Sequence, residues 1–351
     1  MKVDQAQPTR KGEELAVERL HPYLEVHLGI KGPLTVKQFP SGFSNLTYLL
    51  SLGDKELVLR RPPFGAEEIN KGHDMAREYK VLSQLHPVYA KAPRPLLYCD
   101  ATDIIGAPFY VMERVAGIIL RAGRPIDLPE GTLQQLCYNF IDSLAALHSI
   151  DIEATGLVEM GKPAGYLERQ VVGWSKRYKK TQTDEIAAMD QLIDWLAANL
   201  PSSPKASMIH NDYKFDNLVL DEQDPTYIKA VLDWEMATVG DPLSDLGLAL
   251  AYYPEAHDPA PMLQFSLPVT KGMLTRKALV ERYQEKRDVT LTPSQLIFYY
   301  AFGLFKIGVI VQQIYYRYKK GYTQDERFAA LIYLLKAAAA MATQAIEKEK
   351  L

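Results

Sequence analysis

The sequence predicts an α+β protein with two lobes, a small antiparallel β lobe carrying one helix and a large, mainly helical lobe. The first observation is a series of short strand patterns between residues 36 and 115. The second is the helical periodicity that prevails from about residue 128 onward. The third is an isolated hairpin pattern, residues 218–232, within the helical half. We therefore expect an N-terminal lobe at 1–115 and a C-terminal lobe at 116–351.

The first lobe is expected to hold five strands and a helix. Short apolar runs mark the strand patterns; Gly42 and Asn45 separate the first two, and Gly53 and Asp54 separate the second and third. Apolar residues recur at helical spacing from Ile69 to Leu85. The expected strands are 36–39, 46–52, 56–60, 96–99 and 109–115, with a helix at 67–85 and a further helix at 12–30 before the sheet.

The second lobe is expected to be built from helices around the one hairpin. Turn-forming residues join its strands, 218–220 and 228–232. Asp241 followed by Pro242 is typical of a helix start, with the aspartate as cap. The expected helices are 129–148, 164–180, 184–200, 242–252, 275–287, 293–319 and 323–347, and the Pro-rich stretch 254–272 is expected to be a surface loop.

Composition excludes several classes of protein. The 351 residues are 47% hydrophobic and 24% charged, with a net charge of −3, which argues against a nucleic-acid binder. Two cysteines are too few for a disulfide framework, so we expect a reducing, cytoplasmic environment. The N-terminus lacks an apolar signal core, and the apolar stretch 296–311 is interrupted by Lys306. We therefore expect no membrane association; oligomeric state is left open.

Polar residues gather at the ends of the hairpin strands. Asp212 and Asn217 precede the first strand, and Asp233 follows the second. Because a hairpin brings these ends together, the three side chains are expected to converge as a base and oxygen ligands, which Mg²⁺-assisted phosphoryl transfer requires. A polar loop of ordinary turn formers is the alternative.

The same stretch resembles a known catalytic loop. His210, Asp212, Asn217 and the later Asp233 have the spacing of the protein-kinase loop and its metal-binding aspartate. Asn211 and the pair Trp234–Glu235 depart from protein kinases, and this version resembles the aminoglycoside phosphotransferase family. The resemblance implies a protein-kinase-like fold and ATP- or GTP-dependent, Mg²⁺-dependent phosphorylation of a small-molecule hydroxyl group.

The resemblance also implies roles for single residues. Asp212 would be the base, and Asn217 and Asp233 would hold Mg²⁺. Arg60, positioned by Glu78, would bind the nucleotide phosphates, although the family has Lys at this place. His210 would support the loop, and Asp245 resembles the buried aspartate that fixes the loop backbone. Glu235 would join the metal shell or form a local salt bridge, and it is also a candidate substrate contact. The arginine keeps open an alternative, a non-catalytic kinase-like binding protein.

Nucleotide-binding residues are expected in two further places. Gly42, Ser44 and Asn45 fall where a kinase-like protein has its phosphate-covering loop, although an ordinary turn would look the same. At the end of the fifth strand, the backbone near Glu113 to Val115 would contact adenine, with Met112 as a wall of its pocket. A plain buried strand is the alternative there.

A helical face carries the candidate acceptor residues. Tyr166, Arg169 and Trp174 lie largely on one face of a helix, a pattern that an amphipathic core helix also explains. Together with Leu59–Pro63, this segment resembles a subgroup that includes the kinase-like domains fused to acyl-CoA dehydrogenases. The basic run 176–180 follows, so the expected acceptor is an anion such as a hydroxyacyl-CoA or a hydroxy acid. A protein Ser/Thr kinase is disfavoured, because no Ala-Pro-Glu segment follows Asp233.

Overall fold

The structure is a computed structural model that describes residues 3–40, 45–65, 74–323 and 325–351. Its contacts divide the chain into two compact units that interleave in sequence. The first unit contains Met1–Ile119, Leu218–Asp224 and Ile228–Ala237, and the second contains Leu120–Asn217, Pro225–Tyr227 and Thr238–Leu351. The first break lies close to the boundary expected after residue 115, but the hairpin groups with the first unit and not with the residues around it in sequence.

The first unit is built on a five-stranded antiparallel sheet with strand order β1-β2-β3-β5-β4. Its strands are β1 (Leu34–Gln38), β2 (Leu46–Leu52), β3 (Lys55–Arg61), β4 (Pro95–Cys99) and β5 (Phe109–Glu113). All five strands were expected, and β2 has the predicted bounds. In the register, Arg60 on β3 lies between Thr47 of β2 and Tyr110 of β5.

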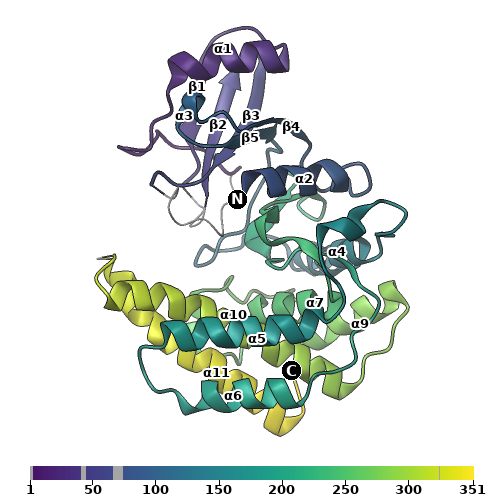
Figure 1. The fold of residues 1–351 in the computed structure, drawn as a ribbon. Helices are drawn as coiled ribbons and strands as arrows, with labels where there is room; N and C mark the ends of the chain where they lie inside the picture. The colour runs from purple at the N-terminus through teal and green to yellow at the C-terminus, as the bar shows by residue number, and fades with distance from the viewer. Residues whose placement is uncertain (1–2, 41–44, 66–73, 324) are drawn as a thin grey trace. The chain divides into compact units, whose positions relative to one another are not determined.

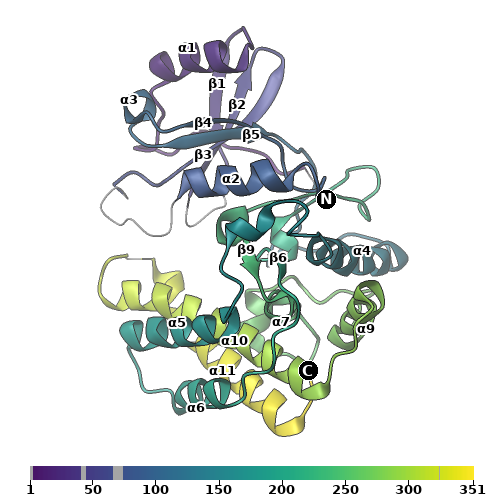
Figure 2. The same ribbon diagram turned by 45° about the vertical axis from the view of Figure 1, so that its right-hand side comes forward.

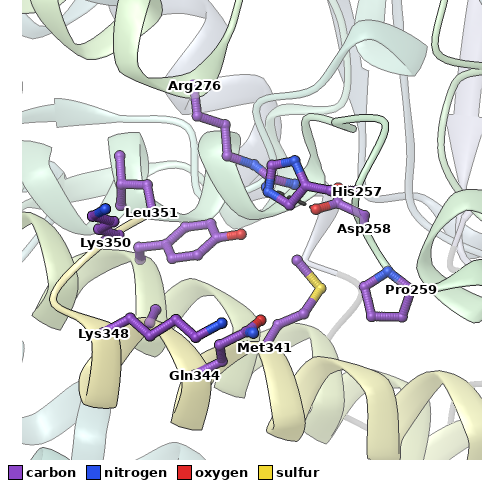
Figure 3. A pocket seen from close by; sticks show the side chains of 11 residues that line it. His257, Asp258, Pro259, Arg276, Met341, Gln344, Lys348, Lys350 and Leu351 are labelled. Atoms are coloured by element: carbon purple, nitrogen blue, oxygen red, sulfur yellow. Dashed lines mark hydrogen bonds and ion pairs between the residues drawn. The ribbon is translucent and has the colours of Figure 1, made fainter.

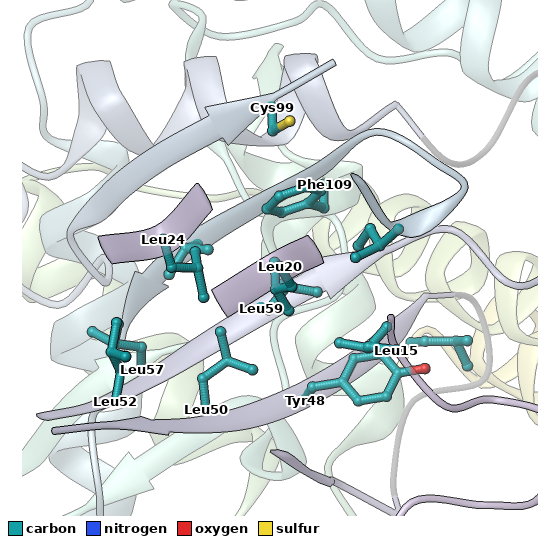
Figure 4. Packing of buried hydrophobic residues seen from close by; sticks show 13 residues of the cluster. Leu15, Leu20, Leu24, Tyr48, Leu50, Leu52, Leu57, Leu59, Cys99 and Phe109 are labelled. Atoms are coloured by element: carbon teal, nitrogen blue, oxygen red, sulfur yellow. The ribbon is translucent and has the colours of Figure 1, made fainter. Parts of the chain in front are cut away.

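Helices cover both faces of this sheet, as Figures 1 and 2 show for α1 (Val17–Leu28) and α2 (Met75–Leu85). Leu20 and Leu24 of α1 pack against Leu50 and Leu59 of the sheet, and this cluster forms the core in Figure 4. Alternate strand residues point to the opposite face. The sheet therefore presents Arg60 and its neighbours to the α2 side.

Helix α1 is shorter than expected, and only part of the segment predicted for the second helix is described. The helix predicted at 12–30 begins at Val17 and ends before Gly29, which has a positive φ of 68°. The helix predicted at 67–85 begins at Met75, because Asp74 is extended and caps the helix by accepting a hydrogen bond from the Arg77 N–H. Residues 66–73 lie outside the described ranges. A short helix, α3 (Thr102–Ile105), was not expected.

The hairpin of β7 (Leu218–Leu220) and β8 (Ile228–Val231) packs within the first unit. The Ile118 N–H donates to the Leu220 carbonyl, and the reverse bond is also present. Gly117 permits this approach, since a Cβ there would lie 2.2 Å from the Leu220 oxygen. These bonds are the reason why the hairpin groups with the sheet unit.

The second unit is mainly helical. Its helices are α4 (Glu130–His148), α5 (Tyr166–Thr181), α6 (Ala187–Ala198), α7 (Pro242–Tyr252), α8 (Ala260–Gln264), α9 (Arg276–Arg287), α10 (Pro293–Lys319) and α11 (Leu331–Lys348). Every helix expected here is present, while α8 and the pairing of β6 (Ser207–Ile209) with β9 (Thr238–Gly240) were not expected. The Asp241 side chain caps α7 as predicted.

Two segments are long and apolar enough to cross a membrane, judged by length and composition over the described residues. They are Pro293–Lys319 and Glu326–Lys348, and 78% and 56% of their most apolar windows are buried inside the structure. Helix α10 packs on α7 and α11. Burial of this kind is typical of core helices, and the expectation of no membrane association stays a prediction.

Candidate functional site

In the first unit, three carboxylates surround the guanidinium of Arg60. Nη1 lies 3.0 Å from Glu78 Oε1, while Nη2 lies 3.1 Å from Asp233 Oδ1 and 3.3 Å from Glu235 Oε2. We call these four residues the Arg60 cluster. The ion pair expected between Arg60 and Glu78 is present, and both side chains are almost completely buried. Strand β3 places the arginine, α2 places Glu78, and the segment after β8 supplies the other two carboxylates.

Burial and charge oppose each other in this cluster. Burial raises the pKa of Glu78, and Arg60 only partly offsets that effect. Burial disfavours the charged form of Arg60, but Glu78 and the other neighbours outweigh it, so the pKa of Arg60 lies well above its usual value. With one guanidinium and three carboxylates, the cluster has an excess of negative charge when all are ionised.

Glu235 links the cluster to two other elements. Asn45 Nδ2, at the start of β2, donates to Glu235 Oε2 over 2.8 Å. Arg77 of α2 donates to the backbone carbonyls of Glu235 and Ala237. The sequence offered a local salt bridge as one role for Glu235, and Arg60 is its partner. The connection to Asn45 was not expected; Gly42 and Ser44, of the same expected phosphate-covering loop, lie outside the described residues.

Asp233 has an unusual backbone conformation. Its φ and ψ are 67° and 63°, in the left-handed region, which costs about 1–3 kcal/mol for a residue other than glycine. Its side chain is 31% exposed, in contrast to the buried Arg60 and Glu78. Strained backbone is often retained where a side chain must be presented in one direction. An accessible carboxylate so presented fits a metal ligand.

The three residues expected around adenine, Met112, Glu113 and Val115, lie at or just beyond the end of β5. Met112 is buried in the sheet, and Glu113 is the last residue of β5. The Glu113 N–H donates to the Arg94 carbonyl, and the Arg94 N–H donates to the Glu113 side chain. Val115 follows outside the strand. The Glu113 N–H is thus already bonded within the protein, and the expected contact with adenine stays a prediction.

In the second unit, Asp212 lies on a loop whose backbone is fixed by Asp245. The two oxygens of Asp245 accept hydrogen bonds from the backbone N–H groups of His210 and Asn211, over 2.7 and 2.8 Å. This is the role expected for Asp245. His148 lies 3.1 Å from the same carboxylate. Burial would raise the pKa of Asp245, but the hydrogen bonds outweigh it and the pKa is lowered, so Asp245 remains an anion that holds the loop.

Asp212 is partly exposed and has a cation beside it. Lys214 Nζ lies 3.0 Å from Oδ1 and 2.9 Å from Oδ2 of Asp212. Burial disfavours the charge on Lys214, but Tyr252 and Asp212 outweigh it and raise the pKa of Lys214. Lys214 was not among the residues expected in the site, although a basic residue two positions after the candidate base was a signal. The lysine gives Asp212 a fixed, charged neighbour.

Asn217 also contacts Asp212. Its Nδ2 donates to the Asp212 backbone oxygen over 2.9 Å and to Oδ2 over 3.0 Å. No hydrogen bond to its Oδ1 comes from the residues with described positions, which leaves an amide oxygen available to a hard cation. Over the described ranges, no three His, Cys, Asp or Glu side chains form a metal cage.

The expected acceptor residues lie on α5 as predicted, but their side chains have partners. Tyr166 donates to Asn211 Oδ1 over 3.2 Å, and Trp174 Nε1 donates to Gln170. Arg169 bonds the backbone carbonyls of Lys162 and Ala164. Tyr166 and Trp174 are buried, so the structure favours a supporting role for them as much as a contact with acceptor. Their assignment to the acceptor stays a prediction.

The second unit contains two pockets of note among the described residues. One, of about 80 Å³, is lined by polar and aromatic side chains that include Lys214, Asp216, Tyr252, Phe215 and Phe265. It adjoins Asp212 through Lys214. The other has a volume of about 210 Å³, and Figure 3 shows Gln344 and Lys348 of α11 opposite Arg276 and Asp258. Arg276 is neutralised there by Asp258 and Glu255, so we assign this pocket no role.

The chain is similar in sequence to curated proteins of one family. A relative from Rattus norvegicus, acyl-CoA dehydrogenase family member 11, is 37% identical over 317 residues, which cover 88% of this chain and 40% of the relative. Member 10 of the same family, from Mus musculus, is 33% identical and is matched over 30% of its length. The chain thus spans less than half of these curated relatives.

Solved structures show the same fold. A putative aminoglycoside phosphotransferase from Ralstonia eutropha JMP134 superposes with a TM-score of 0.79 at 28% identity, covering 94% of this chain and 99% of that one. Choline kinase from Cryptosporidium parvum superposes with a TM-score of 0.66 at 15% identity, covering 95% and 97% of the two chains. The expected α+β, protein-kinase-like fold is confirmed. The sequence model of the phosphotransferase enzyme family matches residues 35–266, and the chain belongs to that family.

Proposed function

We propose that this chain transfers the γ-phosphoryl group of ATP, or of GTP, to a hydroxyl group of a small anionic molecule, with Asp212 as the base. The proposal rests on the exposure and the contacts of Asp212. It is partly exposed, on a loop fixed by Asp245, and it contacts both Lys214 and Asn217. A base must be held rigidly and still be reachable by the acceptor.

The chemistry assigned to Asp212 is a proton transfer. As the acceptor oxygen attacks the γ-phosphorus, its proton passes to the Asp212 carboxylate, the new O–P bond forms, and the bond from phosphorus to the β-phosphate oxygen breaks. Lys214 fixes the carboxylate and offsets negative charge near the attacking oxygen. Tyr166 holds the loop from α5 through Asn211.

Arg60 is assigned to the nucleotide phosphates. Its planar group can make two parallel bonds to a phosphate, and Glu78 holds Nη1 in place. Nη2 is bonded to Asp233 and Glu235 in this structure. A nucleotide phosphate would therefore compete with these two carboxylates, and Asn45, also bonded to Glu235, would respond to the same exchange.

Asn217 Oδ1 and the accessible carboxylate of Asp233 are the groups that would hold Mg²⁺. The ion would supply positive charge to offset the phosphate oxygens. Glu235 is assigned to Arg60 and not to the metal, because its carboxylate already bonds both Arg60 and Asn45.

For the acceptor, we propose an anion with an apolar portion, such as a hydroxyacyl-CoA or a hydroxy acid. The pocket beside Lys214 has aromatic walls and a cation next to the base. The names of the relatives, acyl-CoA dehydrogenase family members, are in line with an acyl-CoA-like acceptor. After Tyr166 and Trp174, α5 exposes four basic side chains, of which Lys179 pairs with Asp190; they are Lys176, Arg177, Lys179 and Lys180.

The test is a panel of acceptors incubated with Mg²⁺ and either ATP or GTP. We expect hydroxyacyl-CoA or hydroxy acids to be phosphorylated, and kanamycin-type amines to be poor acceptors, because a basic surface repels polycations. Raising the salt concentration should increase the KM of the anions, since screening becomes strong beyond about 10 Å at 0.1 M ionic strength. Turnover of the amines alone would refute the proposed acceptor class. Nucleotide binding without turnover of any member would favour the non-catalytic alternative.

A further inference from the structure

Lys306 is a buried cation that the proposed chemistry does not use. It lies in the middle of α10 and is 2% exposed. Its Nζ lies 5.5 Å from the ring centre of Trp174 and 5.8 Å from that of Phe302. In the part of the chain that the structure describes, no carboxylate oxygen lies within 4.0 Å of this nitrogen. Burying an ammonium group without an ion partner opposes folding, so packing alone does not explain the lysine.

The hydrogen-bond partner of Lys306 is the residue before the proposed base. Nζ lies 3.2 Å from Asn211 Oδ1, which also accepts a hydrogen bond from Tyr166. Asn211 has a φ of 65°, in the left-handed region that residues other than glycine rarely adopt. Its N–H is bonded to Asp245. The strained residue is thus held from three directions, by α5, α7 and α10.

The geometry points to Lys306 as a positioning residue, which holds Asn211 in its left-handed conformation so that Asp212 faces the acceptor. The inference rests on the function proposed above. A hydrogen bond from an ammonium group is roughly twice as strong as one between neutral groups, so the charge strengthens the hold on the asparagine. The lysine acts through Asn211 and has no contact assigned to substrate.

The surroundings make the charge on Lys306 sensitive to pH. Burial lowers the pKa of Lys306 to about 8; Asp245 on α7 and Asp212 on the loop oppose the shift, and Arg177 on α5 adds to it. Above this pH the amine is neutral and holds Asn211 less strongly. We therefore expect the wild-type kcat to fall as the pH rises past about 8.

The experiment compares Lys306→Met with a matched control, Gln312→Met. Gln312 is buried on the same helix and bonds Thr181 and Thr183, so its replacement also removes buried hydrogen bonds but does not touch Asn211. Two quantities are measured, the steady-state kinetics and the hydrogen exchange of backbone amides in residues 209–217. Lys306→Gln, which keeps a donor without the charge, serves if the methionine variant does not fold.

We expect Lys306→Met to lower kcat about tenfold with little change in nucleotide KM, because small displacements of reacting groups cost rate. Its loop amides should exchange faster than in the wild type, and its alkaline loss of kcat should disappear. Gln312→Met should show none of these changes. Glycine at position 211 tolerates a positive φ and has no side chain for Lys306 to hold. In the Asn211→Gly background, Lys306→Met should therefore not lower kcat further.

The inference would be overturned if the loop amides of Lys306→Met exchanged at the wild-type rate. It would also be overturned if the double variant lost kcat by the product of the losses in Lys306→Met and Asn211→Gly. A negative result for Lys306 can be distinguished from a failure of the proposed function. If the wild type has no turnover that depends on Asp212, the proposed function fails, and the exchange of the loop amides still decides whether Lys306 holds the loop.

Discussion

Three cations with little exposure to solvent differ in the charges that lie beside them. Arg60 has three carboxylate partners, and Lys214 has Asp212. Lys306 has an amide oxygen and two aromatic rings instead. Carboxylates keep the first two cations charged at all ordinary pH values, whereas burial dominates at Lys306. Among these three cations, Lys306 is therefore the one expected to titrate near neutral pH.

The stability of the protein should reflect that titration. The folded-state pKa of Lys306 is about 8, below the ordinary value of 10.5, so the unfolded state binds more protons between these two values. The free energy of unfolding should then rise with pH in this window, by about 2 kcal/mol between pH 7.5 and 9.5. Urea unfolding of the wild type and Lys306→Met measures this as a difference. Parallel pH dependences for the two proteins would contradict the assignment.

A second prediction at this scale concerns Asp233. Replacement by alanine removes a charged oxygen ligand, so the thermal stabilisation that Mg²⁺ adds to nucleotide binding should be lost. Stabilisation by ATP without Mg²⁺ should remain. Asp54→Ala is the control, because Asp54 is an aspartate in the first unit with 83% of its side chain exposed. An equal Mg²⁺-dependent shift in Asp233→Ala and Asp54→Ala would exclude Asp233 as a ligand.

At the scale of elements, long or strongly patterned segments could be predicted from sequence. Helix α10 and helix α7 have the expected bounds, because Thr292 and Asp241 cap them and proline follows each cap. The β6–β9 pair could not be predicted. Each strand has three residues and lies far from its partner in sequence, so neither pattern nor turn chemistry identifies it. Helix α3, with four residues, is also too short to show a helical period.

Close packing of α7 on α10 depends on two glycines. A Cβ on Gly247 would lie 2.2 Å from the Tyr299 carbonyl oxygen, and one on Gly303 would lie 2.5 Å from the Gly247 oxygen. The contacting atoms are backbone, so they cannot move aside as a side chain would. This contact supports the loop indirectly, because α7 carries Asp245 and α10 carries Lys306.

Gly247→Ala should therefore lower the free energy of unfolding, by about 1–3 kcal/mol, as overpacked cores do. Gly173→Ala is the matched control. Gly173 lies within α5 with no atom near its added Cβ, so alanine should stabilise the helix by about 0.5–1 kcal/mol. Urea unfolding of both variants measures the two changes in the free energy of unfolding, which should have opposite signs. A stabilised Gly247→Ala would show that α7 and α10 do not pack this closely.

For the molecule as a whole, the sequence identified the residue types of the site more completely than their partners. An arginine at the end of a strand, followed by a glutamate on the next helix, predicted the ion pair of Arg60 and Glu78. The contacts of Glu235 with Arg60 and Asn45, and that of Lys306 with Asn211, join residues far apart in sequence. No local pattern encodes such contacts. The expected meeting of Asp212 with Asp233 joins residues of different units and stays a prediction.

The chain also spans only 40% of the rat relative it matches, so the phosphotransferase activity proposed here concerns this region. Its family membership supports small-molecule kinase activity. Within this region, Asp212 is the residue proposed to remove the proton of an acceptor hydroxyl group.

The most direct test is the turnover of Asp212→Asn with the best acceptor of the panel, beside Asp190→Asn as a control at an exposed residue of the same unit. Asparagine keeps the size of the side chain and cannot take the proton. We predict that kcat falls about 10²–10⁴-fold while Mg·ATP binding, measured by thermal shift, is retained. Asp190→Asn should behave as the wild type. Turnover of Asp212→Asn at the wild-type rate would contradict the account.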